Sequence, residues 1–351
     1  MCRARVVMRS SLNYDHRLQL VTFAGDTRRM LISKFCAFSS YKQMPTFLDF
    51  NCSKTIDCKQ GAVRAVRYNV DGSYCMSCGS DKKIKLWNPA SGLLLKTYGG
   101  HADEVTDAAG SCDSSYIVSA SLDKSIIYWD VSTGTPVRRL RSHAGGVRCV
   151  CFNEDSSIAI SGGRDNAVMC WDIRTRRLDP VQVMKEARDC ITAVLTNEHK
   201  IFAASLDGCV RHYDIRVGEL TCDKIGQPIT YLAQTRDEQC LLAGCQDSAL
   251  RLLDCESGGL LSEYKGHQAD DYHIECGFLS NDAHIVAGSC AGDAYVWDLL
   301  EAKVLQRIRI SDNGGVVHSL ATHPKRQELL FARRRDMHVF STDVQIEEEQ
   351  L

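Results

Sequence analysis

Two stretches of the sequence repeat a histidine, a serine and an aspartate at identical spacing. The residues are His101, Ser119 and Asp123 in one stretch and His143, Ser161 and Asp165 in the other. These are the residue types of hydrolase triads, in which a histidine takes the proton of a serine nucleophile. A catalytic triad is needed only once, however, and here the set occurs twice, so a structural role is the better interpretation.

A tryptophan, Trp129 or Trp171, follows each histidine after 28 residues. The indole N–H is only a donor, which suits a buried hydrogen-bond chain better than a reaction. No G-x-S-x-G sequence, phosphate-binding loop, H-E-x-x-H motif or paired-carboxylate motif stands out. We therefore predict two structural tetrads, no catalytic residue, no enzyme activity, no cofactor and no metal site.

The elements that must position these residues form a repeat. The aromatic anchors Trp87, Trp129, Trp171 and Tyr213 are each 42 residues apart, and looser steps of 40, 44 and 43 lead to Leu253, Trp297 and Phe340. Short β-rich runs bounded by Gly, Ser, Asn and Asp fill each copy, for example 115–121 and 125–131. A period of 40–45 residues is typical of propeller blades with four strands each.

The chain resembles the WD-repeat β-propeller family in "GHADEV", "LDKSIIYWD" and "RDNAVMCWD", over about residues 47–343. The resemblance implies an all-β, seven-bladed WD-repeat β-propeller. Only three strands can be found in 315–343, and "NCSKTIDC" (51–58) precedes the first complete blade. We predict that this N-terminal strand closes the last blade, because an open ring would leave unpaired sheet edges. In the family the four tetrad residues form a buried chain from Trp through Ser and His to Asp.

The other blades keep only parts of the tetrad. The first has Lys59 where histidine is expected, the fourth has Tyr213 and Ala203 in place of Trp and Ser, the sixth has Ala291 in place of Asp, and the seventh keeps none. We expect packing to hold these blades and expect them to be the softer part of the ring. The partial tetrads are Ser77, Asp81, Trp87, Asp207, Asp247, His267 and Trp297.

Function in such a ring lies in its faces. The top face is the one formed by the loops between blades and the turns before the third strands. The register places there Glu104, Leu122, Arg148, Arg164, Arg188, Leu206 and Gln246, together with Arg333, Arg334 and Arg335. The basic cluster could bind an acidic peptide or RNA phosphate; alternatively, these are simply solvated turns.

On the opposite face, "WDIR" and "YDIR" are consecutive D-x-R copies formed by Asp172 with Arg174 and by Asp214 with Arg216. Some WD-repeat substrate receptors of cullin ubiquitin ligases carry this motif. Aspartate also caps turns readily and arginine is common on surfaces, so the motif by itself is weak.

A narrower resemblance, to the mitogen-activated protein kinase organizer group of WD-repeat scaffolds, runs from about Lys54 to Phe340 and includes "EARDCIT" and "GQPIT". It implies a scaffold with protein partners: kinase-cascade components, spliceosomal proteins and a HIF prolyl hydroxylase. RNA would be contacted only indirectly, and the protein would be a monomer within larger complexes. The alternative function is that of a ubiquitin-ligase substrate receptor.

The composition limits the possible partners and cellular compartments of the protein. With 42 Lys+Arg against 44 Asp+Glu, the net charge of -2 gives no overall attraction to nucleic acid or anionic membrane. No signal peptide or membrane span is evident, and 18 scattered cysteines fit a reducing compartment, either cytoplasmic or nuclear. Residues 1–46 are expected to be a disordered or mis-started extension, 47–343 the propeller and 344–351 an acidic tail.

Overall fold

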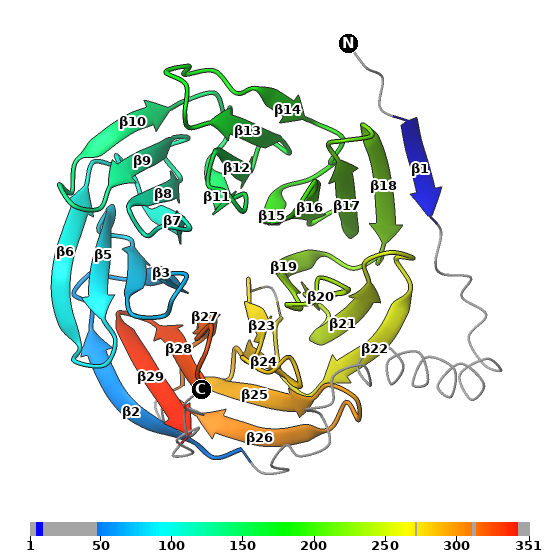
Figure 1. Ribbon diagram of the computed structural model, residues 1–351. Helices are drawn as coiled ribbons and strands as arrows, with labels where there is room; N and C mark the ends of the chain where they lie inside the picture. Colours follow the sequence, from blue (N-terminus) through cyan, green and yellow to red (C-terminus); the bar gives the residue numbers. More distant parts are fainter. Residues whose placement is uncertain (1–4, 10–47, 271, 311–313, 343–351) are drawn as a thin grey trace, which may run out of the picture.

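Seven antiparallel sheets stand like blades around a central axis and close into a ring (Figure 1). The computed structural model describes residues 5–9, 48–270, 272–310 and 314–342. This arrangement confirms the predicted all-β, seven-bladed propeller. Within these ranges, no helix is long and apolar enough to cross a membrane.

Each blade consists of four strands in chain order, from an inner strand at the axis to an outer strand at the rim. The first three blades contain β3 (Val63–Tyr68), β4 (Cys75–Gly79), β5 (Lys83–Asn88), β6 (Leu93–Gly99), β7 (Val105–Gly110), β8 (Tyr116–Ser121), β9 (Ile126–Asp130), β10 (Pro136–Leu140), β11 (Val147–Phe152), β12 (Ile158–Gly163), β13 (Val168–Asp172) and β14 (Gln182–Met184). The next three contain β15 (Ile191–Asn197), β16 (Lys200–Ser205), β17 (Cys209–Asp214), β18 (Glu219–Lys224), β19 (Ile229–Gln234), β20 (Cys240–Cys245), β21 (Ala249–Asp254), β22 (Leu260–Lys265), β23 (Cys276–Phe278), β24 (His284–Gly288), β25 (Asp293–Asp298) and β26 (Val304–Arg309).

The seventh blade joins the two ends of the propeller. It contains β27 (Val317–Thr322), β28 (Glu328–Arg333) and β29 (Asp336–Thr342), and its outer strand is β2 (Phe50–Asp57). β2 runs antiparallel to β29, with Phe50 opposite Thr342 and Asp57 opposite Asp336. The predicted closure by an N-terminal strand is therefore confirmed, and no sheet is left without its outer strand.

The hydrophobic core lies between the blades. Each anchor residue packs against the blade that precedes its own: Trp129 lies with Ile84 and Tyr98 of the first blade, and Trp171 lies with Val118 of the second. The other anchors, Trp87, Tyr213, Leu253, Trp297 and Phe340, take equivalent places in the remaining interfaces. The repeat period of the sequence therefore corresponds to the spacing of the anchor residues, each of which packs its blade against the preceding one.

Six of the seven inner strands, all except β23, have a β-bulge close to their first residue. Register shifts place one extra residue there, and a bulge redirects the side chain that it contains. The bulged residues are Arg64, Thr106, Arg148, Thr192, Thr230 and His318. All of them except Thr230 line a cavity on the ring axis.

The N-terminal extension contributes one described strand. β1 (Arg5–Arg9) runs parallel to β18 as a fifth strand of the fourth blade, at the right of Figure 1. At these five residues the structure has a strand where the sequence suggested disorder. The rest of the predicted extension (1–4 and 10–46) and the acidic tail (344–351) lie outside the described residues, so the proposed domain boundaries stay predictions.

Candidate functional site

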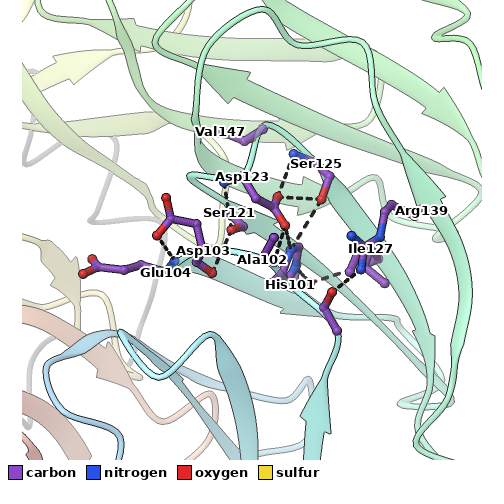
Figure 2. A network of polar contacts seen from close by, with 12 residues as sticks. His101, Ala102, Asp103, Glu104, Ser121, Asp123, Ser125, Ile127, Arg139 and Val147 are labelled. Carbon is purple, nitrogen blue, oxygen red and sulfur yellow. Dashed lines mark hydrogen bonds and ion pairs between the residues drawn. The ribbon is translucent and has the colours of Figure 1, made fainter.

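The second blade contains a complete hydrogen-bond chain. Trp129 Nε1 donates to Ser119 Oγ at 2.8 Å, and Ser119 Oγ lies 2.7 Å from His101 Nε2. His101 Nδ1 then lies 3.0 Å from Asp123 Oδ2, and this carboxylate also accepts the backbone N–H of Ala102 at 2.8 Å (Figure 2). The chain therefore ties the loop that enters the blade to its second and third strands.

The third blade repeats the same geometry. Trp171 Nε1 donates to Ser161 Oγ at 2.9 Å, Ser161 Oγ lies 2.8 Å from His143 Nε2, and His143 Nδ1 lies 2.9 Å from Asp165 Oδ1. In both tetrads, the four residues that the sequence analysis predicted to interact are joined by hydrogen bonds.

Neither serine can act as a nucleophile in this arrangement. Ser119 and Ser161 are both 0% exposed, and each hydroxyl already contacts a histidine and a tryptophan. A catalytic nucleophile must instead reach a substrate atom. Burial by itself would raise the pKa of the Asp123 carboxyl, but hydrogen bonds from His101, Ser125 and the Ala102 N–H hold that pKa well below its usual range. The aspartate is thus a charged structural acceptor.

The first blade has a complete tetrad that the sequence analysis missed. Gln60, not Lys59, takes the histidine position: its Oε1 accepts from Ser77 Oγ, and its Nε2 lies 3.3 Å from Asp81 Oδ1. Trp87 Nε1 donates to Ser77 Oγ at 2.8 Å. The expectation of Lys59 was wrong because it assumed a constant spacing of 28 residues, whereas Gln60 stands 27 before Trp87.

The fourth and fifth blades replace the tetrad with an ion pair. Arg211 binds Asp207 with both terminal nitrogens, at 2.7 and 3.2 Å, and Arg251 binds Asp247 at 2.5 and 3.0 Å. Each arginine stands across the ladder from an alanine, Ala203 or Ala243, at the position where the tetrad blades have serine. These blades therefore do not depend on packing alone, as the sequence had suggested.

The sixth blade keeps only fragments of the tetrad. Trp297 Nε1 donates to the Lys265 carbonyl at 3.0 Å, and the His267 ring lies edge-on to the indole. Among the described residues, His267 Nδ1 has no hydrogen-bond partner, and burial lowers the pKa of His267 to about 4. In the seventh blade, Phe340 packs on Phe331 without any tetrad residue.

A cavity of about 640 Å³ opens on the ring axis between the inner strands. Arg67 lies deep in it, between two carboxylates: Glu275 receives both terminal nitrogens at 2.7 and 2.9 Å, and Asp107 lies 2.9 Å away. The guanidinium also covers the Tyr231 ring at 5.7 Å from the centroid. This group, Arg67 with Asp107 and Glu275, is called the axial clasp below.

The axial clasp connects most of the ring. Glu275 also accepts Ser319 Oγ at 2.6 Å and the Leu320 N–H at 2.9 Å in the seventh blade, and Asp107 accepts the Val150 N–H of the third at 3.2 Å. Burial raises the pKa of Asp107 to about 6, against the lowering effect of Arg67. For Glu275, burial raises the pKa, but Arg67, His273 and the Ser319 hydroxyl together outweigh it, so the pKa is lowered. The sequence analysis did not find these residues, because they meet only across the axis.

The candidate partner residues of the top face divide into exposed and buried groups. Arg164, Arg188, Arg334 and Arg335 are exposed, whereas Glu104, Leu122, Arg148, Leu206 and Gln246 are partly buried. The placement of Arg333 in an exposed basic turn was wrong. This side chain is 7% exposed and donates to the Gly314 carbonyl, because it belongs to the end of β28 and not to the turn after it.

On the opposite face, the D-x-R aspartates cap turns. Asp172 accepts the Arg174 N–H at 2.9 Å, and Asp214 accepts the Arg216 N–H at 2.9 Å. Asp298 does the same for Leu300 in a blade without the arginine. The aspartate thus has a structural role, while the Arg174 side chain lies 3.5 Å from Asp172 Oδ1 and, at 70% exposed, is accessible to a partner.

Residues for a metal ion are not gathered anywhere in the described ranges, since no three His, Cys, Asp or Glu side chains are grouped suitably. The C-x-x-C pair, Cys75 and Cys78, lies buried in β4. Burial raises the pKa of both thiols well above the usual range, as for cysteines packed as small apolar side chains.

Comparison with known proteins agrees with this architecture. The family model for the WD domain, G-beta repeat, matches residues 50–88, 92–130 and 134–172. Each matched segment begins with the outer strand of one blade and ends with the third strand of the next. Four-stranded blades in a closed ring, seated by these anchors and tied by Trp–Ser–His–Asp chains, define a WD-repeat β-propeller.

Relatives cover most of the ring. WD repeat domain-containing protein 83 of Rattus norvegicus is 60% identical over 80% of this chain and 88% of its own length. The Homo sapiens protein of that name is 55% identical over 84% and 93%, and the Dictyostelium discoideum homolog is 31% identical over 80% and 94%. The chain belongs to the WD-repeat propeller family of WD repeat domain-containing protein 83. This confirms the resemblance to the organizer group.

Proposed function

We propose that this protein is a non-catalytic scaffold that assembles protein complexes. Its clients would be components of the mitogen-activated (extracellular-signal-regulated) kinase cascade, spliceosomal proteins acting in pre-mRNA splicing, and a HIF prolyl hydroxylase. These two roles would place it in both the cytoplasm and the nucleus. The WD-repeat fold generally mediates contacts between proteins, and the relatives carry no enzyme name.

The observation that carries this proposal is the contrast between the interior and the surface. The serine, histidine and aspartate residues of the tetrads hydrogen-bond to one another inside the blades, whereas arginines on the top face are exposed to solvent. A ring whose blades are stabilised by internal hydrogen bonds can bind different clients on different surfaces. Such a scaffold raises the effective concentration of one client near another without any new contact between them.

Titration of the protein into a reconstituted kinase cascade tests the proposal. We expect activation to rise and then fall, because excess scaffold separates the clients onto different copies. Reversal of charge at Arg148, Arg164 and Arg188 should lose one client while the fold remains intact. The matched control reverses Arg174, Arg176 and Arg177, three exposed arginines of the opposite face. A monotonic rise to a plateau, with clients not limiting, would count against scaffolding.

A second candidate function, substrate receptor of a cullin-RING ubiquitin ligase, is favoured by the exposed D-x-R arginines. Arg216 lies between Ile215 and Val217, which are 61% and 69% exposed, so charged and apolar surface adjoin there. The double variant Arg174→Ala/Arg216→Ala should lose a co-purifying cullin adaptor if this function holds. Co-purification of kinases or spliceosomal proteins, unchanged in that variant, supports the scaffold instead.

A further inference from the structure

Three arginines line the axial cavity near the first residues of the inner strands, at the end that is called the mouth below. Arg64 and Arg148 come from the bulges of the first and third blades, and Arg334 comes from the turn between β28 and β29. All three line the cavity. Residues far apart in the chain thus bring guanidinium groups to one opening.

Two of these charges are not matched by a carboxylate. Arg64 Nε lies 2.8 Å from Glu104, but neither Arg148 nor Arg334 has an ion-pair partner among the described residues. Below them, the axial clasp sets two carboxylates, Asp107 and Glu275, against the single guanidinium of Arg67. The floor of the cavity therefore has an excess of negative charge, whereas its mouth has unpaired positive charge.

The backbone leaves room for Arg334 at this place. A Cβ added to Gly315 would lie 3.2 Å from Arg334 Nε, and the φ of Gly315 is 115°, which L residues rarely adopt. Glycine at position 315 therefore allows the loop to pass close beside the guanidinium. A larger residue would press on the side chain that lines the mouth.

We propose that the cavity mouth binds a phosphorylated serine or threonine side chain of a protein client. Guanidinium groups bind phosphate with paired N–H donors, and a phosphate carries close to two negative charges at neutral pH. Arg148 and Arg334 would hold the phosphate, and Arg64 would reach it by releasing Glu104. The proposal deepens the scaffold function and rests on it, since it gives the chemistry of one client.

A protein segment fits this site better than RNA. A cavity of about 640 Å³ has the size of sites that take small groups, and a single phosphorylated side chain enters such a space from an extended peptide. Tyr272, which is 53% exposed, lines the same cavity and offers apolar surface to a neighbouring residue of the peptide. An RNA strand would need a track of successive basic contacts, whereas the net charge of the chain is -2.

The test uses the full chain and three probes. One is a degenerate nine-residue peptide pool with a fixed central phosphoserine, the second is the same pool with serine, and the third is a single-stranded RNA oligonucleotide. Wild type is compared with Arg148→Ala/Arg334→Ala and with the control Arg176→Ala/Arg177→Ala, which removes the same charge from an exposed segment elsewhere. Retention on immobilised protein and fluorescence anisotropy are measured at fixed salt.

We expect wild type and the control to retain the phosphoserine pool at least tenfold more than the serine pool, and the cavity variant to lose that preference. Thermal melting checks that the cavity variant is folded. Equal retention of both pools, an equal loss in the control, or a preference for RNA would overturn the proposal. If wild type shows no preference for the phosphoserine pool while the cascade titration still rises and falls, this site is rejected and the scaffold function stands.

Discussion

At the scale of single residues, the amide of Gln60 makes the hydrogen bonds that the two imidazole nitrogens of histidine make in the other tetrads. Its oxygen accepts from Ser77 and its nitrogen faces Asp81, as His101 Nε2 and Nδ1 do for Ser119 and Asp123. An amide and a neutral imidazole each offer one donor and one acceptor in this geometry. The first blade therefore keeps the tetrad without a histidine.

Replacing Gln60 by alanine should destabilise the protein by about 1–3 kcal/mol, because Ser77 and Asp81 lose a buried partner. Lys59→Ala should change the free energy of unfolding by less than about 0.5 kcal/mol, because Lys59 is exposed. Urea denaturation of the two variants measures the difference. Equal losses would mean that Gln60 is not a member of the tetrad.

His267 should make stability depend on pH. Its pKa is lowered to about 4 by burial, below the ordinary value of 6.5, so the unfolded chain binds the proton more readily. Stability from this residue is therefore fully present above pH 6.5 and is lost as the pH falls toward 4. His267→Phe keeps a ring beside Trp297 and should reduce the loss between pH 6.5 and 4 by up to about 3 kcal/mol. An unchanged pH profile in urea titrations would contradict the lowered pKa.

The tetrads show what spacing can and cannot predict. His101 and His143 were found because their offsets to tryptophan are identical, while Gln60 was missed because its loop is one residue shorter. The offset identifies a residue only when the loop length is constant. A glutamine also gives no signal of its own, since the chemistry that fits it here depends on Ser77 and Asp81 facing it.

At the scale of elements, the observed strands agree closely with those predicted from the sequence, but the polar contacts that stabilise each blade differ from blade to blade. Alternating runs and turn residues located strands such as β8 and β9 to within a residue or two at each end. The Asp207–Arg211 and Asp247–Arg251 pairs could not be found this way, because each depends on a small residue on the neighbouring strand. Those ion pairs result from how neighbouring strands pair and not from the residue pattern along a single strand.

The closing strand gives the clearest prediction for an element. Removal of residues 1–58 takes β2 away from β29 and should destabilise the propeller strongly, since an entire sheet edge becomes exposed. Removal of residues 1–43 also deletes β1, but β18 keeps its partner β17, so the melting temperature should change little. Thermal melting of both truncated chains compares them. Equal stability would rule out closure by β2.

At the scale of the whole molecule, the axial clasp joins blades that are far apart in the chain. Arg67 and Glu275 are 208 positions apart, and the two acids flank one guanidinium in the centre of the ring. The blade count could be predicted because every copy bears its own anchor. Asp107 and Glu275 both stand 22 residues before their anchors, Trp129 and Trp297, whereas Arg67 stands 20 before Trp87. The clasp could not be predicted, because these residues become neighbours only when the ring closes.

Arg67→Met should cost about 3–5 kcal/mol, because Asp107 and Glu275 would remain buried without their counter-ion. The triple variant Arg67→Met/Asp107→Asn/Glu275→Gln should recover much of that loss, since no unpaired charge is left. Urea denaturation at neutral pH measures both. A triple variant as unstable as the single one would show that the clasp acts through shape and not through charge.

The pairing of β2 with β29 also has a consequence for how the protein is made. Ser53 of β2 and Val339 of β29, which share a hydrogen bond, are 286 positions apart, and bringing ends so distant together costs on the order of 5 kcal/mol of chain entropy. Six blades can assemble from strands that leave the ribosome one after another, but β2 must wait until almost the whole propeller has been translated. During that time, both β2 and the growing edge of the ring are open to pairing with foreign strands. Loss of only the last strand, as by a late stop codon, would leave β2 permanently in this state.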